Sequence, residues 1–373
     1  MRRIAILIDA LNPRAQRSEH PPQLVDALTA AGMQVELHWV SGGMLARLDR
    51  RSSLSTGLAP LEGAWSQVLA SRPDAVLAYD PASPAAWLAA RICRRLEVPL
   101  LLIEPAWFTL RPLHERALDS IGRRLWGRRV RQLTSQVICL DPIGEQRVLE
   151  AGYPRERIER IPTGVDPTVF RPGATSHLPA RHRLRGRMLL YAGPLASGRG
   201  LEQLMTAYGR TVGQRSDWSL VLAGSGPLRN RLDILASRLG CRVGVRFLPW
   251  PERDELPGLM CASTIMAVPG EDDRARGRQI VRAMACGLPV MVSPLPRLSF
   301  RIEHERTGYV VPDEPRAWEA ALDRVASAPA IRREWASEAR ATVERDFAWP
   351  VLAQRYVESI ERAIDGMLLP ASA

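Results

Sequence analysis

The chain has 373 residues, 46% of them hydrophobic, which is enough material for two packed domains rather than one. Its formal net charge is +11, and because the sequence contains no lysine, all 51 basic residues are arginines. This composition excludes a Walker-type phosphate loop, a Schiff-base mechanism and a lysine general base, each of which needs an ammonium group. No apolar run approaches the roughly 20 residues that a membrane-spanning helix needs.

The first half of the chain alternates short apolar runs with amphipathic stretches. The runs predict strands at residues 3–9, 34–40, 75–78, 99–103 and 136–140. Helical patterns between them include residues 22–31 and 85–96. The first run is too short for a signal segment and meets Asp9, so we interpret it as a buried strand. This alternation is typical of a doubly wound α/β domain.

The alternation stops and restarts near the middle of the chain. Pro, Gly and Ser cluster between residues 170 and 179, and a new apolar run begins at Arg187. Further strands are predicted at residues 219–223, 242–248, 264–268 and 290–293. We therefore predict a first domain at residues 1–172, a linker at 173–186, a second domain at 187–346 and a C-terminal segment at 347–373. Two α/β domains of similar size predict a cleft between them.

The segment from Arg274 to Ser293 is predicted to form a loop, a short helix and a buried strand. A helix that begins after Gly277 directs free N–H groups and the positive end of its dipole at whatever lies in front of it. Residues 277–279 would therefore suit a phosphate. A strand-helix-strand crossover without any ligand explains the same pattern, so both interpretations stay open.

Cysteine and histidine usage gives no sign of a metal site. The five cysteines are odd in number and widely spaced, which argues against a disulfide framework and a zinc cluster and favours a reducing cytoplasm. The six histidines have no spacing typical of metal ligands. We expect no metal to be bound.

Several longer stretches follow one another in an order and spacing that is specific. They are Ile161-Pro-Thr-Gly-Val-Asp-Pro-Thr-Val-Phe-Arg-Pro172, Tyr191-Ala-Gly-Pro-Leu-Ala-Ser-Gly-Arg-Gly-Leu-Glu202, Leu220-Val-Leu-Ala-Gly-Ser-Gly-Pro-Leu-Arg229, Phe247-Leu-Pro-Trp-Pro-Glu-Arg-Asp-Glu-Leu-Pro257, Met284-Ala-Cys-Gly-Leu-Pro-Val290 and Thr307-Gly-Tyr-Val-Val-Pro312. Together they resemble the retaining glycosyltransferases of the GT-B architecture that are often called family 4. The stretch 347–362 is similar to the last helix of this family, which crosses back onto the first domain.

The resemblance implies two Rossmann-like domains that face a central cleft. It implies transfer of a hexose from a nucleotide-sugar, bound by the second domain, to a glycan, lipid-linked or small-molecule acceptor bound by the first, with retention of the anomeric configuration. No metal and no cofactor beyond the nucleotide-sugar co-substrate are expected. The donor-binding residues that the resemblance implies are Gly193, Arg199, Gly224, Gly226, Leu248, Arg274, Gly277 and Arg282.

The donor segment differs from the family pattern in its charges. The family holds the diphosphate with an arginine and a lysine, and the corresponding positions are Pro194 and Arg199, so only Arg199 keeps a cation. Two family glutamates, which contact the donor sugar and the ribose, are replaced by Arg274 and Arg282. A guanidinium donates hydrogen bonds but cannot accept them, so the recognition of hydroxyl groups must change.

Other charged residues of the same segment could compensate for these replacements. Arg274, Arg276 or Arg278 could reach the diphosphate from the opposite wall of the site. The acids at residues 271–273 could take the place of the missing glutamates. A solvated loop of mixed charge, with no role in binding, is the alternative.

The first domain differs from the family as well. The loop at residues 10–20 lacks the glycine pair of the family, so the close approach of its backbone to a phosphate or an acceptor is lost. Glu104 stands where the family often has a histidine, at the predicted carboxyl end of a strand. We take Glu104 as the candidate catalytic residue, which would accept a proton from a sugar hydroxyl or stabilise positive charge. A structural salt bridge is the alternative.

The stretch at residues 111–131 is strongly basic, with apolar residues at helical spacing. It could contact an anionic membrane surface or guide a lipid-phosphate acceptor, which would place the protein in the cytoplasm at the inner face of the membrane. A core-packing helix with a solvated basic face is the alternative. No nucleic-acid recognition motif is present, so we expect no nucleic-acid partner.

Three hypotheses of different class follow from the sequence. The first is an active glycosyltransferase with a reworked donor site. The second is a catalytically inactive relative that acts as a partner or regulator of an active transferase, since the two glutamates, the phosphate-binding arginine and the glycine pair are replaced. The third is a basic scaffold that binds a membrane surface or a polyanion.

Overall fold

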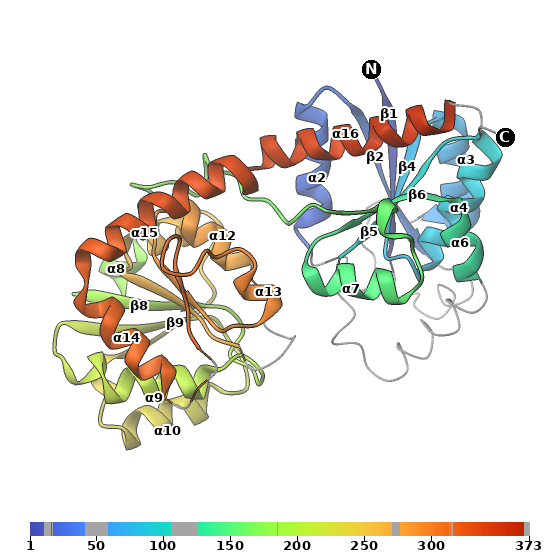
Figure 1. Cartoon of the computed structure of the whole chain (residues 1–373). Coiled ribbons are helices and arrows are strands. Elements are labelled where there is room, and N and C mark those ends of the chain that lie inside the picture. The colour runs from blue at the N-terminus through green and yellow to red at the C-terminus, as the bar shows by residue number, and fades with distance from the viewer. Residues whose placement is uncertain are drawn as a thin grey trace. The chain divides into compact units, whose positions relative to one another are not determined.

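The computed structural model describes residues 1–10, 16, 18–41, 59–105, 126–184, 186–270, 277–312, 314 and 316–368. It contains two compact units, each built on a parallel sheet (Figure 1). The first unit comprises Met1–Thr163 and Trp349–Ala373, and the second comprises Gly164–Ala348. The predicted fold class, two doubly wound α/β domains, is confirmed.

The sheet of the first unit has seven strands in the order β3-β2-β1-β4-β5-β6-β7. These are β1 (Arg3–Asp9), β2 (Gln34–Ser41), β3 (Ala59–Pro60), β4 (Ala75–Tyr79), β5 (Leu100–Glu104), β6 (Thr134–Cys139) and β7 (Ile158–Arg160). Every residue of β4 and β5 is buried, which explains their continuous apolar runs, because helices cover both faces of a parallel sheet. The strand order reverses between β1 and β4, so the crevice at the carboxyl ends of these two strands is the switch point of the sheet.

Helices pack on both faces of this first sheet. They are α2 (His20–Ala30), α3 (Leu61–Ser71), α4 (Pro84–Leu96), α6 (Arg128–Leu133), α7 (Pro142–Glu150) and α16 (Trp349–Leu368). Helices α2 and α16 share one apolar core with the sheet, and α3, α4 and α6 share the core on its other face. Ser83 begins α4 by accepting a hydrogen bond from the backbone N–H of Ala86 at 3.1 Å, and Glu97 ends it in a left-handed conformation.

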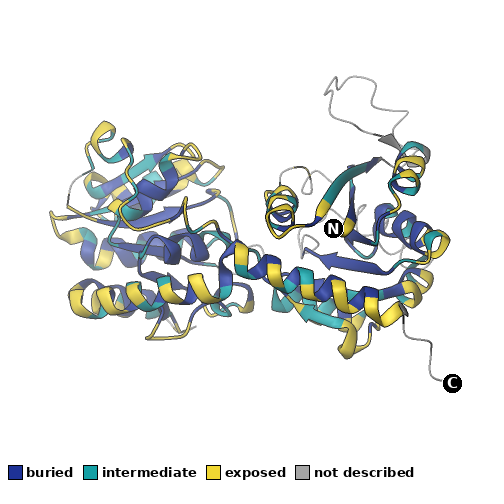
Figure 2. Ribbon diagram, turned by 90° about the horizontal axis from the view of Figure 1, so that it is seen from above, coloured by how far each residue is buried: buried dark blue, intermediate teal, exposed yellow. Residues whose placement is uncertain are grey.

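Helix α16 brings the C-terminal part of the chain into the core of the first unit. Its buried face includes Trp349, Leu352, Tyr356 and Ile360, which pack against α2 and the sheet. The opposite face carries exposed polar residues such as Gln354, and Figure 2 shows this alternation along the helix. An amphipathic pattern of this kind is expected for a helix that lies on a core.

The sheet of the second unit has six strands in the order β10-β9-β8-β11-β12-β13. These are β8 (Arg187–Ala192), β9 (Trp218–Ala223), β10 (Val245–Leu248), β11 (Ile265–Val268), β12 (Val290–Val292) and β13 (Tyr309–Val310). Alternate side chains of β8 enter different cores, with Leu189 on one face and Leu190 on the other. Both faces of the sheet are therefore covered.

The helices of the second unit complete these two cores. They are α8 (Leu178–Arg181), α9 (Leu201–Arg210), α10 (Arg229–Arg238), α11 (Glu255–Ala262), α12 (Arg278–Ala285), α13 (Pro296–Ser299), α14 (Ala317–Ser327) and α15 (Pro329–Thr342). Helices α9, α10 and α14 contribute to one core, whereas α8, α11 and α12 contribute to the other.

The boundary between the units differs from the predicted one. Val165 and Phe170 belong to the apolar core of the second unit, and the backbone N–H of Val165 donates to the carbonyl of Phe347 at 3.0 Å. Residues 164–172 therefore belong to the second unit, although the sequence placed them in the first domain. The predicted linker at 173–186 includes α8, whose Leu178 is buried in the same core. Turn-forming residues predicted a loop there, but the packing of Leu178 makes this segment part of the second unit.

Glycine is required where the loops after β8 and β9 meet. A Cβ atom added to Gly224, whose φ is +152°, would overlap the carbonyl oxygen of Gly193. A Cβ atom at Gly226 would similarly overlap the carbonyl of Leu195. Both obstructions are backbone atoms, which cannot move aside as a flexible side chain can. The two loops can lie in contact only because these positions lack a side chain.

Replacing Gly224 with Ala is expected to destabilise the second unit by about 3 kcal/mol or more, because the two loops must separate. The matched control is Gly240→Ala, where φ is +69° but no atom lies within 4 Å of the added Cβ. That change should cost only about 1 kcal/mol, the strain of a left-handed alanine. Urea denaturation measures both values, and equal losses in the two variants would contradict the close-contact argument.

Replacing Leu352 with Ala is expected to destabilise the first unit by about 2–5 kcal/mol, because a fully buried side chain is truncated. Gln354→Ala is the control on the same helix, since Gln354 is exposed and its hydrogen bond to Glu358 is a surface contact. Thermal unfolding followed by circular dichroism checks the difference. A Leu352→Ala protein as stable as the control would show that α16 is not part of the core.

Candidate functional site

The carboxyl edge of the second sheet carries most of the residues that the sequence predicted to bind a ligand. Strand β8 is followed in the chain by β9 on one side of it and later by β11 on the other, so the sheet has its switch point between β8 and β11. Ligands of open α/β sheets bind in the crevice outside such a switch point. The loops that border this crevice are residues 193–200 after β8 and the loop that begins at Pro269 after β11.

Backbone hydrogen bonds join the loops after β8 and β9 into one layer. The N–H of Gly193 donates to the carbonyl of Ala223, and the N–H of Leu195 donates to the carbonyl of Ser225, each at 2.9 Å. The N–H of Leu228 donates to the carbonyl of Leu195 at 2.9 Å. These bonds fix a glycine-rich surface at the edge of the sheet.

The next loops are attached to this layer on both sides. The N–H of Gly224 donates to the carbonyl of Leu248 at 2.9 Å, which holds the loop after β10 in place. On the other side, Gly200 lies against the loop after β11, because a Cβ atom added to it would be 2.8 Å from the Cβ of Pro269. The N–H of Gly270 donates to the Ser293 hydroxyl at 2.9 Å. The structure thus brings Gly193, Gly224, Gly226 and Leu248 together.

Arg199 supplies a positive charge at the same edge. It lies between Gly198 and Gly200, both with positive φ, and its side chain is half-buried. Among the described residues, none forms a hydrogen bond or an ion pair with its guanidinium. Burial raises the pKa of the nearby Tyr191 to about 12, and the charge of Arg199 acts in the opposite direction. The Tyr191 hydroxyl donates to the carbonyl of Pro194 at 2.9 Å and so supports the loop.

The residues predicted on the β11 side are placed differently. Gly277 directly precedes α12, and a Cβ atom added to it would lie 2.9 Å from a terminal nitrogen of Arg301. Arg282 is buried in the middle of α12, and its guanidinium lies 5.0 Å from the ring centroid of Phe170. Arg274 lies outside the described residues, as do the acids at 271–273 and Arg276. Of the described residues in this group, Arg282 is the one whose guanidinium contacts an aromatic ring.

Two buried arginines near Gly277 were not found by sequence reasoning. Arg297 and Arg301 are only 4% and 8% exposed, and a terminal nitrogen of Arg301 donates to the carbonyl of Arg297 at 2.7 Å. The Arg301 guanidinium also lies 3.9 Å from the ring centroid of Phe300. Both residues follow the apolar strand β12 in the chain, but an arginine-rich sequence gives no signal for which guanidinium is buried.

Glu104, the candidate catalytic residue, is buried at the carboxyl end of β5 in the first unit. It borders a small cavity of about 110 Å³ that Arg131, Arg147 and Tyr153 also line. Burial is the main cause that raises the pKa of Tyr153, and the negative charge of Glu104 adds to the shift. A carboxylate beside two arginines fits both interpretations of Glu104, a group that acts on a substrate and a structural ion pair.

His20 is a buried residue of the first unit that its local sequence does not single out. Its Nδ1 lies 2.7 Å from the Tyr79 hydroxyl, and its Nε2 lies 3.4 Å from the Tyr356 hydroxyl. Burial raises the pKa of both tyrosines. This cluster joins the start of α2, the carboxyl end of β4 and α16, next to the switch point of the first sheet. The contact with α16 could not be found from local sequence.

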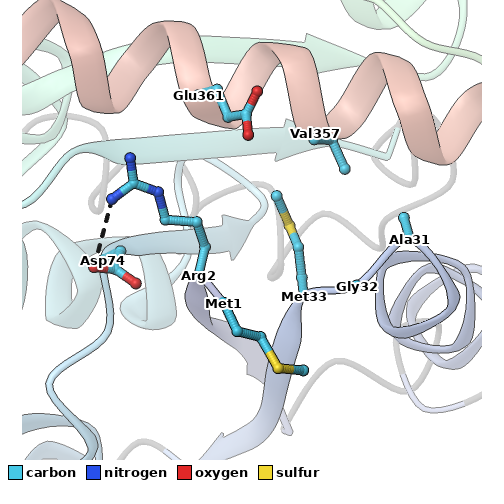
Figure 3. Close-up of a pocket in the computed structure, with 8 residues that line it drawn as sticks. All are labelled: Met1, Arg2, Ala31, Gly32, Met33, Asp74, Val357 and Glu361. Carbon is cyan, nitrogen blue, oxygen red and sulfur yellow. Dashed lines mark ion pairs between the residues drawn. The ribbon is translucent and has the colours of Figure 1, made fainter.

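A larger cavity, of about 420 Å³, lies at the opposite edge of the first sheet (Figure 3). Arg2 and Asp74 face each other across part of it with 4.0 Å between the charged atoms, and Met33 and Val357 line it. The positive charge of Arg2 is therefore already compensated by Asp74. Nothing in this cavity corresponds to a residue that the sequence predicted to be functional.

The described part of the chain contains no group of three His, Cys, Asp or Glu residues placed to hold a metal ion. It also contains no helix that is long and apolar enough to cross a membrane. The basic stretch at 111–131 lies outside the described residues except for residues 126–131. Its proposed contact with a membrane stays a prediction.

Two family models match the chain in adjoining regions. Residues 18–169 match Glycosyltransferase Family 4, and residues 178–342 match Glycosyl transferases group 1. The first match lies almost wholly in the first unit, and the second lies within the second unit.

Curated relatives share part of this sequence. An uncharacterized glycosyltransferase of Methanocaldococcus jannaschii is 31% identical over 182 residues, which is 48% of this chain and 46% of that protein. A GDP-mannose-dependent alpha-(1-6)-phosphatidylinositol monomannoside mannosyltransferase of Mycobacterium tuberculosis is 29% identical over 62% of this chain and 63% of its own length. A D-inositol 3-phosphate glycosyltransferase of Mycobacteroides abscessus is 31% identical over 56% and 47%. The chain spans about half the length of most of the curated relatives that it matches.

Solved structures match nearly the whole chain. A glycosyltransferase of Rickettsia africae superposes with a TM-score of 0.74 at 16% identity, covering 97% of this chain and 98% of that one. HepE of Anabaena, in complex with UDP and glucose, superposes with a TM-score of 0.70 at 18% identity, covering 97% and 100%. The chain therefore has the GT-B fold, with glycosyltransferase sequence signatures in both of its units.

Proposed function

We propose that this protein transfers a sugar from a nucleotide-sugar donor to an acceptor hydroxyl, with retention of the anomeric configuration. The donor would bind at the carboxyl edge of the second sheet, and the acceptor would bind to the first unit. The two family matches support a glycosyltransferase, and HepE, a protein of the same fold, has been solved with UDP and glucose.

The observation that carries the proposal is Arg199 on the glycine-rich edge. Arg199 belongs to the loop after β8, which backbone hydrogen bonds hold against the loop of Gly224, and its charge reaches Tyr191, which lies beside Gly193 at the same edge. A diphosphate gains negative charge as it leaves the sugar, and a fixed cation stabilises that charge in the transition state. Arginine can bind two phosphate oxygens at once. Arg199 is thus suited to hold the leaving group.

The acceptor is expected to be rich in hydroxyl groups, and Glu104 is the residue that would contact it. The curated relatives include proteins named for an inositol phosphate and for a phosphatidylinositol mannoside, which supports a polyol or a lipid-linked sugar. Glu104 ends β5 at the carboxyl edge of the first sheet, where ligands of such sheets bind. A carboxylate at this position could accept a hydrogen bond from a reacting hydroxyl.

A catalytically inactive relative is the second candidate, and Arg282 favours it. The family glutamate at this position contacts the ribose of the donor, but Arg282 is buried against Phe170. A side chain held by an aromatic ring within its own unit is suited to a structural role. An inactive protein would keep the fold and act as a partner of an active transferase.

Calorimetric titration of UDP, GDP, ADP, TDP and CMP, with their common sugar conjugates, tests the proposal directly. Saturable binding of one nucleotide is expected, and Arg199→Ala should raise its Kd about 10- to 100-fold, because a charged hydrogen bond is worth about 1.5–3 kcal/mol. Arg199→Lys should restore part of the loss, since a point charge replaces the fork.

Arg210→Ala is the matched control for this titration. Arg210 lies at the end of α9 and pairs with Glu319 on the surface, away from the glycine-rich loops. Its removal should leave nucleotide affinity unchanged. If no nucleotide binds to the wild-type protein, or if both variants weaken binding equally, Arg199 does not hold a donor phosphate and the inactive candidate gains support.

Replacing Glu104 with Gln is expected to lower kcat about 100-fold or more if this carboxylate transfers a proton. The Kd of the donor nucleotide should not change, because the variant keeps the size of the side chain and lies in the other unit. Transfer to an acceptor measured by nucleotide release, together with the melting temperature, checks this. A lower melting temperature with unchanged kcat would identify Glu104 as part of a structural ion pair.

A further inference from the structure

An unassigned groove lies on the outer surface of the first unit. It is formed by α3, α4 and α6, the helices that cover one face of the sheet, and it has a volume of about 680 Å³. This volume lies in the range of small-molecule pockets. Its main lining residues, which we call the arginine groove, are Trp65, Trp87, Arg91, Arg94, Arg95 and Arg129.

Arg91 is held between two tryptophans. Its guanidinium carbon lies 5.1 Å from the ring centroid of Trp65 and 4.9 Å from that of Trp87. Trp126 in turn packs beside Trp87, with 6.4 Å between ring centroids. All five N–H donors of a guanidinium lie in its plane, so rings that cover its faces leave those donors available. Within the described residues, none accepts a hydrogen bond from Arg91. These two ring contacts favour the position of the exposed Arg91 side chain that the structure shows.

Three further guanidiniums converge on the groove. Arg94 and Arg95 come from the last turn of α4, and Arg129 comes from the first turn of α6. No ion pair joins any of them to the part of the chain that the structure describes, and Glu97 is the only acid in the lining. Like charges held together in a concave site repel one another and focus a positive potential. A negatively charged ligand would relieve this repulsion.

The cavity shown in Figure 3 provides a contrast within the same unit. There, Arg2 is 4.0 Å from Asp74, and Glu361 adds a second acid to the lining. Among the described residues, four arginines and one acid line the arginine groove. The described lining therefore compensates the positive charge less completely in the arginine groove than in the first cavity.

We propose that the arginine groove binds a compact, soluble ligand that carries two or more phosphate groups. Guanidinium groups bind phosphate oxygens in pairs, and several of them in one concave site match clustered phosphates. The shape argues against a membrane surface as the occupant, because the site is a hollow. The indole rings also do not project from it, since neither Trp65 nor Trp87 belongs to the exposed large apolar residues. The rings hold Arg91 instead.

This proposal does not depend on sugar transfer. The groove is built from helices of the first unit, and it shares no residue with the glycine-rich edge of the second unit or with the cavity beside Glu104. A ligand there would act as a regulator or as an additional recognition element. Its binding can be measured without any donor or acceptor.

Calorimetric titration with inorganic triphosphate at moderate salt tests the groove. The wild-type protein should bind it saturably, and Arg91→Gln or Arg129→Gln should each raise the Kd about tenfold or more, as expected for loss of a charged hydrogen bond. Arg128→Gln is the matched control. It removes the same charge from the adjacent position of α6, but Arg128 does not line the groove, so the Kd should change about twofold at most.

Tryptophan fluorescence gives a second measurement. Triphosphate that binds Arg91 should change the fluorescence emission of the neighbouring indoles. In Trp87→Phe the part of this change that comes from Trp87 should disappear. The affinity of this variant for triphosphate should fall only slightly. The Arg199→Ala variant separates the groove from the donor edge, because triphosphate affinity should be unchanged in it even though nucleotide affinity is lowered.

Four results would overturn the proposal. The first is that triphosphate does not bind, and the second is that its affinity falls equally in Arg128→Gln and Arg129→Gln, which would show that only the net charge of the protein attracts it. The affinity could fall in Arg199→Ala but not in Arg91→Gln, which would place triphosphate at the donor edge. Finally, the protein could bind vesicles of phosphatidylglycerol through Arg91 and Arg129 without binding triphosphate, which would make the groove part of a membrane-facing surface.

Discussion

Parallel pairing of the strands is the constraint on which the rest of this molecule depends. Every strand pair in the two described sheets is parallel, so the chain must cross over a face of the sheet between strands. The crossovers place the carboxyl ends of all strands of a sheet at one edge, and they cover both faces with helices. Loops with chemical groups therefore gather at that edge, as Gly193, Arg199 and Gly224 do in the second unit and Glu104 does in the first. The helices, by contrast, present their outer surfaces for other uses, and the arginine groove lies on such a surface.

Much of this organisation could be predicted from sequence because it is encoded locally. The runs at residues 3–9, 34–40 and 75–78 are apolar enough to predict buried strands, and they correspond to β1, β2 and β4. The short strands β3, β7 and β13 were not predicted, whereas the similarly short β12 was, because it lies in the apolar run at residues 288–292. The unit boundary was misplaced because Phe170 joins a core made by distant residues. The same reason hid the His20 cluster, whose partner Tyr356 comes from the other end of the chain. The family resemblance supplied the candidate donor residues, but only the structure separates the half-buried Arg199 at the sheet edge from the buried Arg282.

The absence of lysine gives the arginines a wide range of structural roles. Arg340 donates to the carbonyls of Phe170 at 2.9 Å and Ala285 at 2.6 Å, and thereby fastens the start of the second unit to the end of α12. Arg282 packs on an aromatic ring, and Arg332 is buried with a pKa that desolvation lowers. A planar group that stacks and caps carbonyls can be buried where an ammonium cannot. The net charge of +11 is therefore a poor guide to the location of a binding site. What sets Arg199 and the arginine groove apart is their position, because Arg199 lies on a loop at the carboxyl edge of a sheet and four arginines line the hollow of the groove.

The second unit is an insertion within the first, because the first unit comprises the residues before it and after it in the chain. The chain enters this unit at Gly164 and leaves it at Ala348. Val165 joins the two ends of the unit, through a backbone hydrogen bond to Phe347 and a β-bridge to Ala348. An inserted domain whose ends are held together does not force its host apart, and it can be removed or exchanged as a cassette. Residues 164–348 thus form a natural module for grafting. A different parallel α/β domain could be placed between Thr163 and Trp349 while the host sheet and α16 keep their own core.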